Sequence, residues 1–260
     1  MNESTSRPAA GPAGPPPDVP HEVLGEFYDD ESRRREFLDQ IFDKTAHSYD
    51  WTERLIGFGS GSWYRRQALL RAGLAQGMAV VDVGIGTGLV AREAIAVIGR
   101  ADLLTGVDPS PGMMAQAQLP PGVRLLEGKG EDMPLDDASA DFLSMGFALR
   151  HVSSLSEAFA EFHRVMKPGA RLCLLEITPP ANAVHRAVLR FYMTRIVPTL
   201  AWLRTRDAQT YRIWLYYWKT IEACVAPAVV MSLLRDAGFV DVHRHVELGM
   251  FSEYQARKAD

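Results

Sequence analysis

Beyond Gly77 the chain alternates between short apolar runs and stretches with helical periodicity, and this alternation limits the folds open to it. Short apolar runs bounded by turn residues are typical of strands. They occupy residues 79–83, 103–107, 123–126, 142–147, 171–177 and 240–247. Strands and helices in alternation predict an α/β fold with a doubly wound, mostly parallel sheet. A closing run over 249–257 predicts one more strand, at the antiparallel edge of that sheet.

The remaining sequence divides the chain into three segments. Residues 1–20 contain six prolines among glycines and alanines, which predicts a disordered, extended tail. Residues 21–76 form an N-terminal helical segment, because apolar side chains recur at i, i+4 from Phe37 to Tyr49 and again over 63–74. Residues 77–260 form the α/β domain, in which a mostly helical insertion at about 181–222 is expected to act as a substrate lid.

Charge and composition exclude several classes of protein. With 28 Lys and Arg against 32 Asp and Glu, the net charge of −4 provides no positive field that could hold nucleic acid. The chain has no apolar run of the roughly 20 residues that a membrane span needs, and its first residues lack the apolar stretch of a signal peptide. A cytoplasmic location is therefore expected. Cys173 and Cys224 have no partner at metal-ligand spacing, so no metal site is predicted.

A glycine-rich turn ends the first predicted strand. Asp82 precedes Gly84, Gly86, Thr87 and Gly88, and a helix is expected over 89–98. Glycines at such a turn let a ligand approach the backbone, and the helix start offers N–H groups that are not yet bonded. The motif alone is a weak signal, because dinucleotide-binding domains use similar glycines.

Asp108 strengthens the prediction of a nucleoside site. It ends the next predicted strand, 20 residues beyond Gly88, where a carboxylate can accept hydrogen bonds from both ribose hydroxyls. The alternative is that Asp108 only caps the turn at 109–112. Up to this point a nicotinamide enzyme and a methyl-transfer enzyme would look alike.

Three further segments separate these two classes. Residues 128–135 (GKGEDMPL), 141–147 and 161–172 (EFHRVMKPGARL) together resemble a class I, Rossmann-like S-adenosylmethionine (SAM) methyltransferase. More closely, the chain is similar to the UbiE/MenG family of ubiquinone and menaquinone C-methyltransferases. The resemblance runs from about Phe37 to Lys258 and includes the motifs at 48–50, 58–59, 147–152, 207–212 and 236–239.

The resemblance implies SAM as cofactor and assigns roles to residues at matching positions. Thr87 and Asp108 would contact SAM, with Lys129, Gly130 and Gly146 at its adenine and methionine sides. The full set assigned to the cofactor is Asp82, Gly84, Gly86, Thr87, Gly88, Asp108, Lys129, Gly130 and Gly146. Tyr49 would close over the sulfonium, where the face of its ring favours a cation.

Four positions depart from the family pattern. Leu89 replaces an Asp, His151 replaces an Asn, Lys129 stands where the family has Asp or Asn, and Gly146 stands where it has Ser. His151 is predicted to be the base that removes a phenolic proton, since imidazole titrates near working pH. The neighbouring Arg150 would stabilise the phenolate. The alternative for His151 is a loop residue bonded to backbone.

The insertion suggests the substrate. Residues 182–219 contain seven Arg and Lys, one Asp and eight Phe, Tyr and Trp. Such a composition suits a helix on an anionic membrane surface or the wall of an apolar tunnel, and a lipid quinone fits both. Peripheral association with the inner face of a membrane is therefore expected. A homodimer interface, or a packed lid with a basic rim, would explain the same composition.

The expected reaction is C-methylation of the ring of a polyprenyl quinol. A second interpretation is an RquA-like exchange of a ring methoxy group for an amino group, which converts ubiquinone to rhodoquinone. The third is a non-catalytic SAM-binding partner in a quinone-synthesis complex. Methylation of a small natural product without a lipid tail is a further alternative.

Overall fold

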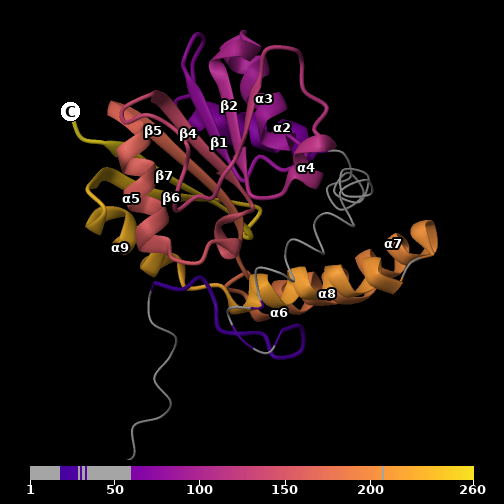
Figure 1. The fold of residues 1–260 in the computed structure, drawn as a ribbon. Coiled ribbons are helices and arrows are strands. Elements are labelled where there is room, and N and C mark those ends of the chain that lie inside the picture. Colours follow the sequence, from indigo (N-terminus) through magenta and orange to yellow (C-terminus); the bar gives the residue numbers. More distant parts are fainter. Residues whose placement is uncertain (1–17, 29, 31–32, 34–59, 207) are drawn as a thin grey trace, which may run out of the picture.

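The structure is a computed structural model that describes residues 18–28, 30, 33, 60–206 and 208–260 (Figure 1). Most of the Pro-rich tail, the helix expected over 37–49 and Tyr49 lie outside the described residues. The helix expected at 63–74 corresponds to α2, Gly61–Arg71.

Seven strands form one sheet in the order β3-β2-β1-β4-β5-β7-β6. The predicted doubly wound, mostly parallel sheet is confirmed, since β1 to β5 are all parallel. The strands are β1 Val80–Val83, β2 Leu104–Asp108, β3 Arg124–Glu127, β4 Ala140–Gly146, β5 Met166–Ile177, β6 Phe239–Glu247 and β7 Phe251–Lys258.

The position predicted for the last strand is wrong. β7 is antiparallel, as expected, but it pairs with β5 on one side and β6 on the other, so β6 is the edge strand. A tight turn after Glu247, with Leu248 and Gly249 at positive φ, folds β7 back between the two. The hairpin connection therefore places the final strand inside the sheet.

Helices cover both faces of the sheet. Successive side chains along each strand point to opposite faces, so each face contributes to a separate apolar core. Leu172 and Leu174 of β5 belong to one core, and Cys173 and Leu175 to the other. The first core lies under α5, Leu155–Val165, and α9, Pro227–Asp236. The second lies under α2 and α3, Leu89–Ile98 (Figure 1).

A short segment, residues 18–28, which we call the strap, lies between the start of α5 and the helical insertion. Both Asp18 carboxylate oxygens accept hydrogen bonds at the start of α5, from the Ser154 hydroxyl and the Ser156 N–H, each at 2.8 Å. The Pro20 carbonyl accepts from Val225 N–H, and Phe27 packs edge-on against Tyr216. The strap therefore ties α5 to the helical insertion.

The insertion folds as α6, Ala183–Phe191, a π-helical turn η3, Tyr192–Ile196, α7, Val197–Thr205, and α8, Ala208–Ala223. These helices form a layer at one end of the sheet (Figure 1). Four of the eight aromatics that were expected on a membrane surface are instead buried on α8: Trp214, Tyr216, Tyr217 and Trp218. They pack with Tyr28 and with α7 in a third core, so these four side chains are packed inside the protein rather than exposed to a membrane.

In the described part of the chain, no single helix is both long and apolar enough to cross a membrane. The segments Thr210–Ala223 and Pro227–Asp236, bent by 69° relative to each other, reach that length and hydropathy only as a pair.

Candidate active site

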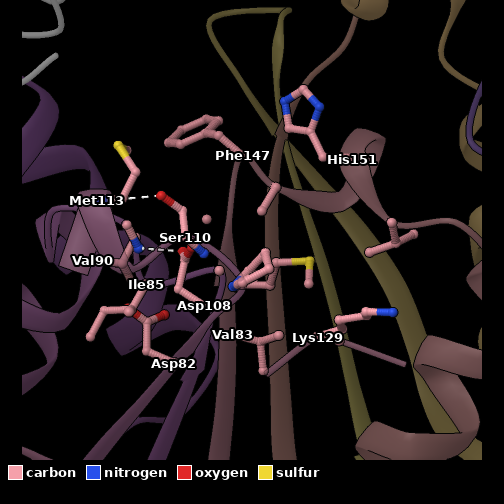
Figure 2. A pocket seen from close by; sticks show the side chains of 18 of the residues that line it. Asp82, Val83, Ile85, Val90, Asp108, Ser110, Met113, Lys129, Phe147 and His151 are labelled. Atoms are coloured by element: carbon pink, nitrogen blue, oxygen red, sulfur yellow. Dashed lines mark hydrogen bonds between the residues drawn. The ribbon is translucent and has the colours of Figure 1, made fainter. Parts of the chain in front are cut away.

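A pocket of about 180 Å³ opens at the carboxyl ends of β1, β2 and β4 (Figure 2). Parallel α/β sheets bind ligands at this edge, where the strand order reverses. All the residues predicted for the cofactor line this pocket except Gly88. Gly88 has a φ of +82° at the start of α3, a conformation that favours glycine, and a side chain there would meet Leu119.

Two glycines keep the pocket open. A Cβ at Gly84 would lie 2.7 Å from the Ala148 Cβ, and φ of Gly84 is +66°. A Cβ at Gly146 would lie 2.4 Å from Val90 Cγ2. Because neither position can accept a side chain without local displacement, the backbone of β1 and β4 stays bare where a ligand must approach closely.

Asp108 is held rigidly at the end of β2. Its Oδ2 accepts the Gly86 N–H and its Oδ1 accepts the Ser110 N–H, both at 2.8 Å. Ser110 in turn caps the short helix α4, Pro111–Ala115, by accepting the Met113 N–H (Figure 2). Asp108 thus organises the following turn, as the alternative interpretation predicted. It also lines the pocket. A carboxylate has about four acceptor sites, more than the two that these N–H groups use.

Asp82 is a buried acid in the floor of the pocket. The Ser144 hydroxyl donates to Oδ1 at 2.7 Å, whereas Oδ2 accepts no hydrogen bond from the described residues. Burial raises the pKa of Asp82 to about 7, although the Ser144 hydrogen bond lowers it, and the charge of Asp108 adds to the rise. An oxygen in this situation suits a cationic or N–H-bearing ligand group, such as the ammonium of an amino acid.

This pKa predicts how stability depends on pH. The pKa of Asp82 is higher in the folded chain than the ordinary value near 3.9 of an unfolded chain, so its contribution to stability is lost as pH rises toward about 7. Asp82→Asn lacks this titrating group. The free energy of unfolding of the variant minus that of wild type should therefore increase by on the order of 2 kcal/mol as pH rises from 5 to 8. Urea unfolding of the ligand-free proteins measures the difference. Parallel pH curves for the two proteins would contradict it.

Arg150 is more deeply buried than its predicted role requires. It lies in the turn η2, Leu149–His151, and its guanidinium pairs with Glu176 of β5 at 2.6 Å. Nε donates to the Thr220 hydroxyl of α8 at 3.2 Å, and the group lies 5.7 Å from the ring centre of Tyr217. Arg150 lines the pocket, but it also joins the sheet to the lid. Its action on a phenolate stays a prediction.

His151 is half-buried and lines the same pocket. Its ring stacks on Tyr216 at a centroid distance of 6.1 Å and is tilted against Tyr217 at 6.4 Å. In Figure 2, Phe147 and His151 lie above Asp108 and Ser110 in the view. His151 therefore contacts the aromatic side chains of α8 and lines the same pocket as Asp108.

The other departures from the family pattern also line the pocket. Lys129 is exposed and Gly130 is buried just beyond β3, and Leu89 begins α3 beside the glycine turn. Leu89 makes that wall of the pocket apolar, where the family pattern has an Asp.

Two charged residues at the site, Glu176 and Arg65, were not predicted from the sequence, whereas a third, Glu131, lies in a motif that the sequence singled out. Glu176 neutralises Arg150, and Glu131 lines the pocket and accepts the Ser153 N–H before α5. Arg65 of α2 also lines the pocket and is 3% exposed. Only Glu131 gave a signal, because it lies in the motif at 128–135. Arg65 and Glu176 come from elements that no spacing linked to the pocket.

Comparison with known proteins matches the sequence to one family. Residues 29–256 match the model of the ubiE/COQ5 methyltransferase family. The ubiquinone/menaquinone biosynthesis C-methyltransferase UbiE of Syntrophotalea carbinolica is 32% identical over 220 residues, covering 82% of this chain and 91% of the relative. The demethylmenaquinone methyltransferase of Chlorobaculum tepidum is 30% identical over 214 residues, covering 80% and 86%.

Solved structures support the fold. A SAM-dependent methyltransferase from Thermotoga maritima superposes with a TM-score of 0.59 at 21% identity, covering 84% of this chain and 99% of that one. Phosphoethanolamine N-methyltransferase 2 of Haemonchus contortus, solved with S-adenosyl-L-methionine, gives 0.62 at 15% identity, covering 90% and 62%. At these identities the likeness shows the class I methyltransferase fold alone.

Proposed function

The chain belongs to the ubiE/COQ5 methyltransferase family and is a SAM-dependent methyltransferase, and on this premise we propose that it methylates a ring carbon of a polyprenyl quinol. Relatives that share about 30% of its residues are named for menaquinone or ubiquinone biosynthesis. One observation carries the proposal: the pocket that holds Asp108 is also lined by His151 and by Tyr217 of the aromatic lid. A nucleoside cofactor and an aromatic ring therefore have walls of suitable chemistry in one cavity.

The residues suggest how the reaction proceeds. SAM supplies the methyl group, carried on its sulfonium. Asp82, Thr87 and Asp108 hold the cofactor against the glycine turn. His151 would take the phenolic proton of the quinol, which moves electron density onto a ring carbon. That carbon would take the methyl group as its bond to sulfur breaks and S-adenosylhomocysteine leaves, and loss of the ring hydrogen as a proton would restore the aromatic ring. The buried aromatics of α8 exclude water and align the ring. The predicted roles of Arg150 at the phenolate and Tyr49 at the sulfonium remain part of this proposal.

The cofactor position is tested by Asp108→Ala. Loss of the carboxylate removes hydrogen bonds to ribose and loosens the turn, so SAM binding should weaken by about 1.5–3 kcal/mol, or roughly 10- to 100-fold. Titration calorimetry measures the dissociation constant. Asp102→Ala is the matched control, because Asp102 is exposed and pairs with Arg100 outside the pocket. If Asp108→Ala bound SAM as tightly as Asp102→Ala, the ribose role would be excluded.

We also propose that α6 rests on an anionic membrane from which the quinol enters. Val184, Val188 and Phe191 recur at i, i+4 and i+7 and are 68%, 63% and 61% exposed. A stripe of this kind normally packs against something apolar. Arg190 and Arg195 are exposed nearby, which favours a negatively charged lipid surface.

The variant Val188→Ser/Phe191→Ser tests this surface. It should bind vesicles of phosphatidylcholine and phosphatidylglycerol about tenfold more weakly than wild type, because it loses apolar burial in the lipid. Cosedimentation measures vesicle binding. Raising the salt concentration should also weaken vesicle binding by the wild-type protein, because salt screens the attraction between its arginines and the anionic lipid. Trp63→Ser, on α2, changes a side chain that is 62% exposed and serves as control. The stripe is a homodimer interface if the wild-type protein does not bind vesicles and sediments as a dimer, while the double variant sediments as a monomer.

A further inference from the structure

Asp18 of the strap caps the start of α5. Its carbonyl accepts the Leu155 N–H at 2.8 Å, and its carboxylate accepts the Ser154 hydroxyl and the Ser156 N–H. Burial alone would raise the pKa of Asp18, but the hydrogen bonds from Ser156 and Ser154 hold it below its usual value. A charged carboxylate therefore lies at the positive end of the helix, supplied by a residue 136 positions before Ser154.

The segment that Asp18 holds continues into the pocket. Residues 151–153 precede α5 and line the pocket. On the pocket side, Glu131 accepts the Ser153 N–H and, at 3.4 Å, the Ser154 N–H. The segment is therefore held between Glu131 on the pocket side and Asp18 of the strap on the other.

The other end of the strap reaches His151 through α8. Phe27 packs edge-on against Tyr216, with ring centres 5.2 Å apart. The fully buried ring of Tyr216 in turn stacks on His151 at a centroid distance of 6.1 Å. The Arg212 guanidinium lies 5.8 Å from the centre of the Phe27 ring and donates to the Glu26 carbonyl at 3.3 Å, which holds Phe27 on α8. The strap, indigo in Figure 1, therefore supports the His151 ring from behind Tyr216.

We propose that the strap is a positioning element for methyl transfer, which fixes the backbone of His151 through Asp18 and its ring through Phe27. The inference rests on the proposed function, because it takes His151 as the base. A base must lie within hydrogen-bond reach of the proton that it accepts, and a displacement of about 1 Å can lower turnover by as much as about 100-fold. The family model matches residues 29–256, so the strap lies outside the region that the family pattern covers.

Asp18→Ala and Phe27→Leu test the two contacts separately. Each should lower kcat about tenfold and leave the KM for SAM within about twofold of wild type, because His151 shifts while the cofactor walls stay in place. Asp18→Asn keeps one acceptor oxygen and should keep part of the rate. Asp141→Ala is the matched control and should keep the wild-type kcat, because Asp141 accepts the Ala79 N–H at 2.9 Å just before β1, at the amino ends of the strands.

A readout other than turnover comes from the imidazole itself. The stacked Tyr216 ring shifts the NMR signal of the His151 Cε1 proton, and His151→Asn identifies that signal among the seven histidines. NMR of protein with labelled histidine should show this signal displaced in Asp18→Ala and in Phe27→Leu, and unchanged in Asp141→Ala. If the signal keeps its wild-type position in both strap variants, the proposal is wrong.

A double-mutant cycle separates positioning from a general effect on the fold. In a His151→Ala background, Asp18→Ala should lower the residual turnover by less than about twofold, because the group that it positions is already absent. An equal loss in both backgrounds would show that the strap acts through the overall structure and would overturn the proposal. If the wild-type protein methylates no quinol, the proposed function fails, and the histidine signal still decides whether the strap positions His151.

Discussion

Replacing Glu176 with alanine should lower the free energy of unfolding by about 3–5 kcal/mol, because it leaves the Arg150 guanidinium buried without its counter-charge. Both side chains are almost completely buried, at 6% and 1% exposure. The pair also joins β5 to η2, and through Thr220 to α8, so the lid should loosen together with the loss of stability. Urea unfolding followed by circular dichroism measures the change.

The double variant Arg150→Met/Glu176→Leu distinguishes a lost partner from lost packing. Replacing a whole buried ion pair by apolar residues of similar size is often nearly neutral. We expect the double variant to unfold close to wild type, while Glu176→Ala does not. A loss below about 1 kcal/mol for Glu176→Ala would show that the pair is well solvated and contributes little to stability.

Turnover by His151→Ala should fall about 10²–10⁴-fold, with SAM affinity nearly unchanged, if His151 is the base that accepts the quinol proton. The wild-type rate should rise with pH as the imidazole loses its proton, and this rise should be absent in the variant. Steady-state kinetics over a pH series measure both effects. His245→Ala, which changes a half-exposed histidine paired with Glu247 on the edge strand, is the control.

His151→Asn restores the residue that is typical of the family. Asn cannot act as a base, so this variant should be as slow as His151→Ala. If it methylates as fast as wild type or faster, His151 is not the base, and the substitution serves a different substrate or reaction.

The fold was predictable from the sequence because its signals are local. Each buried strand is a short apolar run, and the ends of parallel strands bring Asp82, Asp108 and Gly146 to one edge without any further information. The order of the last two strands was not predictable, since either strand of a hairpin can pair with β5. The antiparallel direction of β7 followed from its turn, but its interior position is set by tertiary packing.

The charged residues of the site were harder to predict from the sequence than the fold. Glu176 lies near the end of a predicted strand, but nothing in the sequence pairs it with Arg150. Arg65 lies on a separate helix, and only packing brings it to the pocket. The sequence did contain a signal for the burial of the α8 aromatics. Trp214, Tyr217 and Trp218 recur at helical spacing with Ile213 and Ile221, as on the packed face of a helix. Their number drew attention to a membrane surface, whereas their spacing already indicated a packed face.

We expect this pocket to transfer a methyl group from SAM to the ring of a lipid quinol. The most direct measurement is the product mass after incubating the purified protein with SAM bearing a CD₃ group and a reduced demethylated polyprenyl quinone. The account predicts one CD₃ in place of one ring hydrogen, and fragmentation that locates the label on a ring carbon. A product in which an amino group has replaced a ring methoxy group, or no product from a protein that binds both compounds, would contradict it.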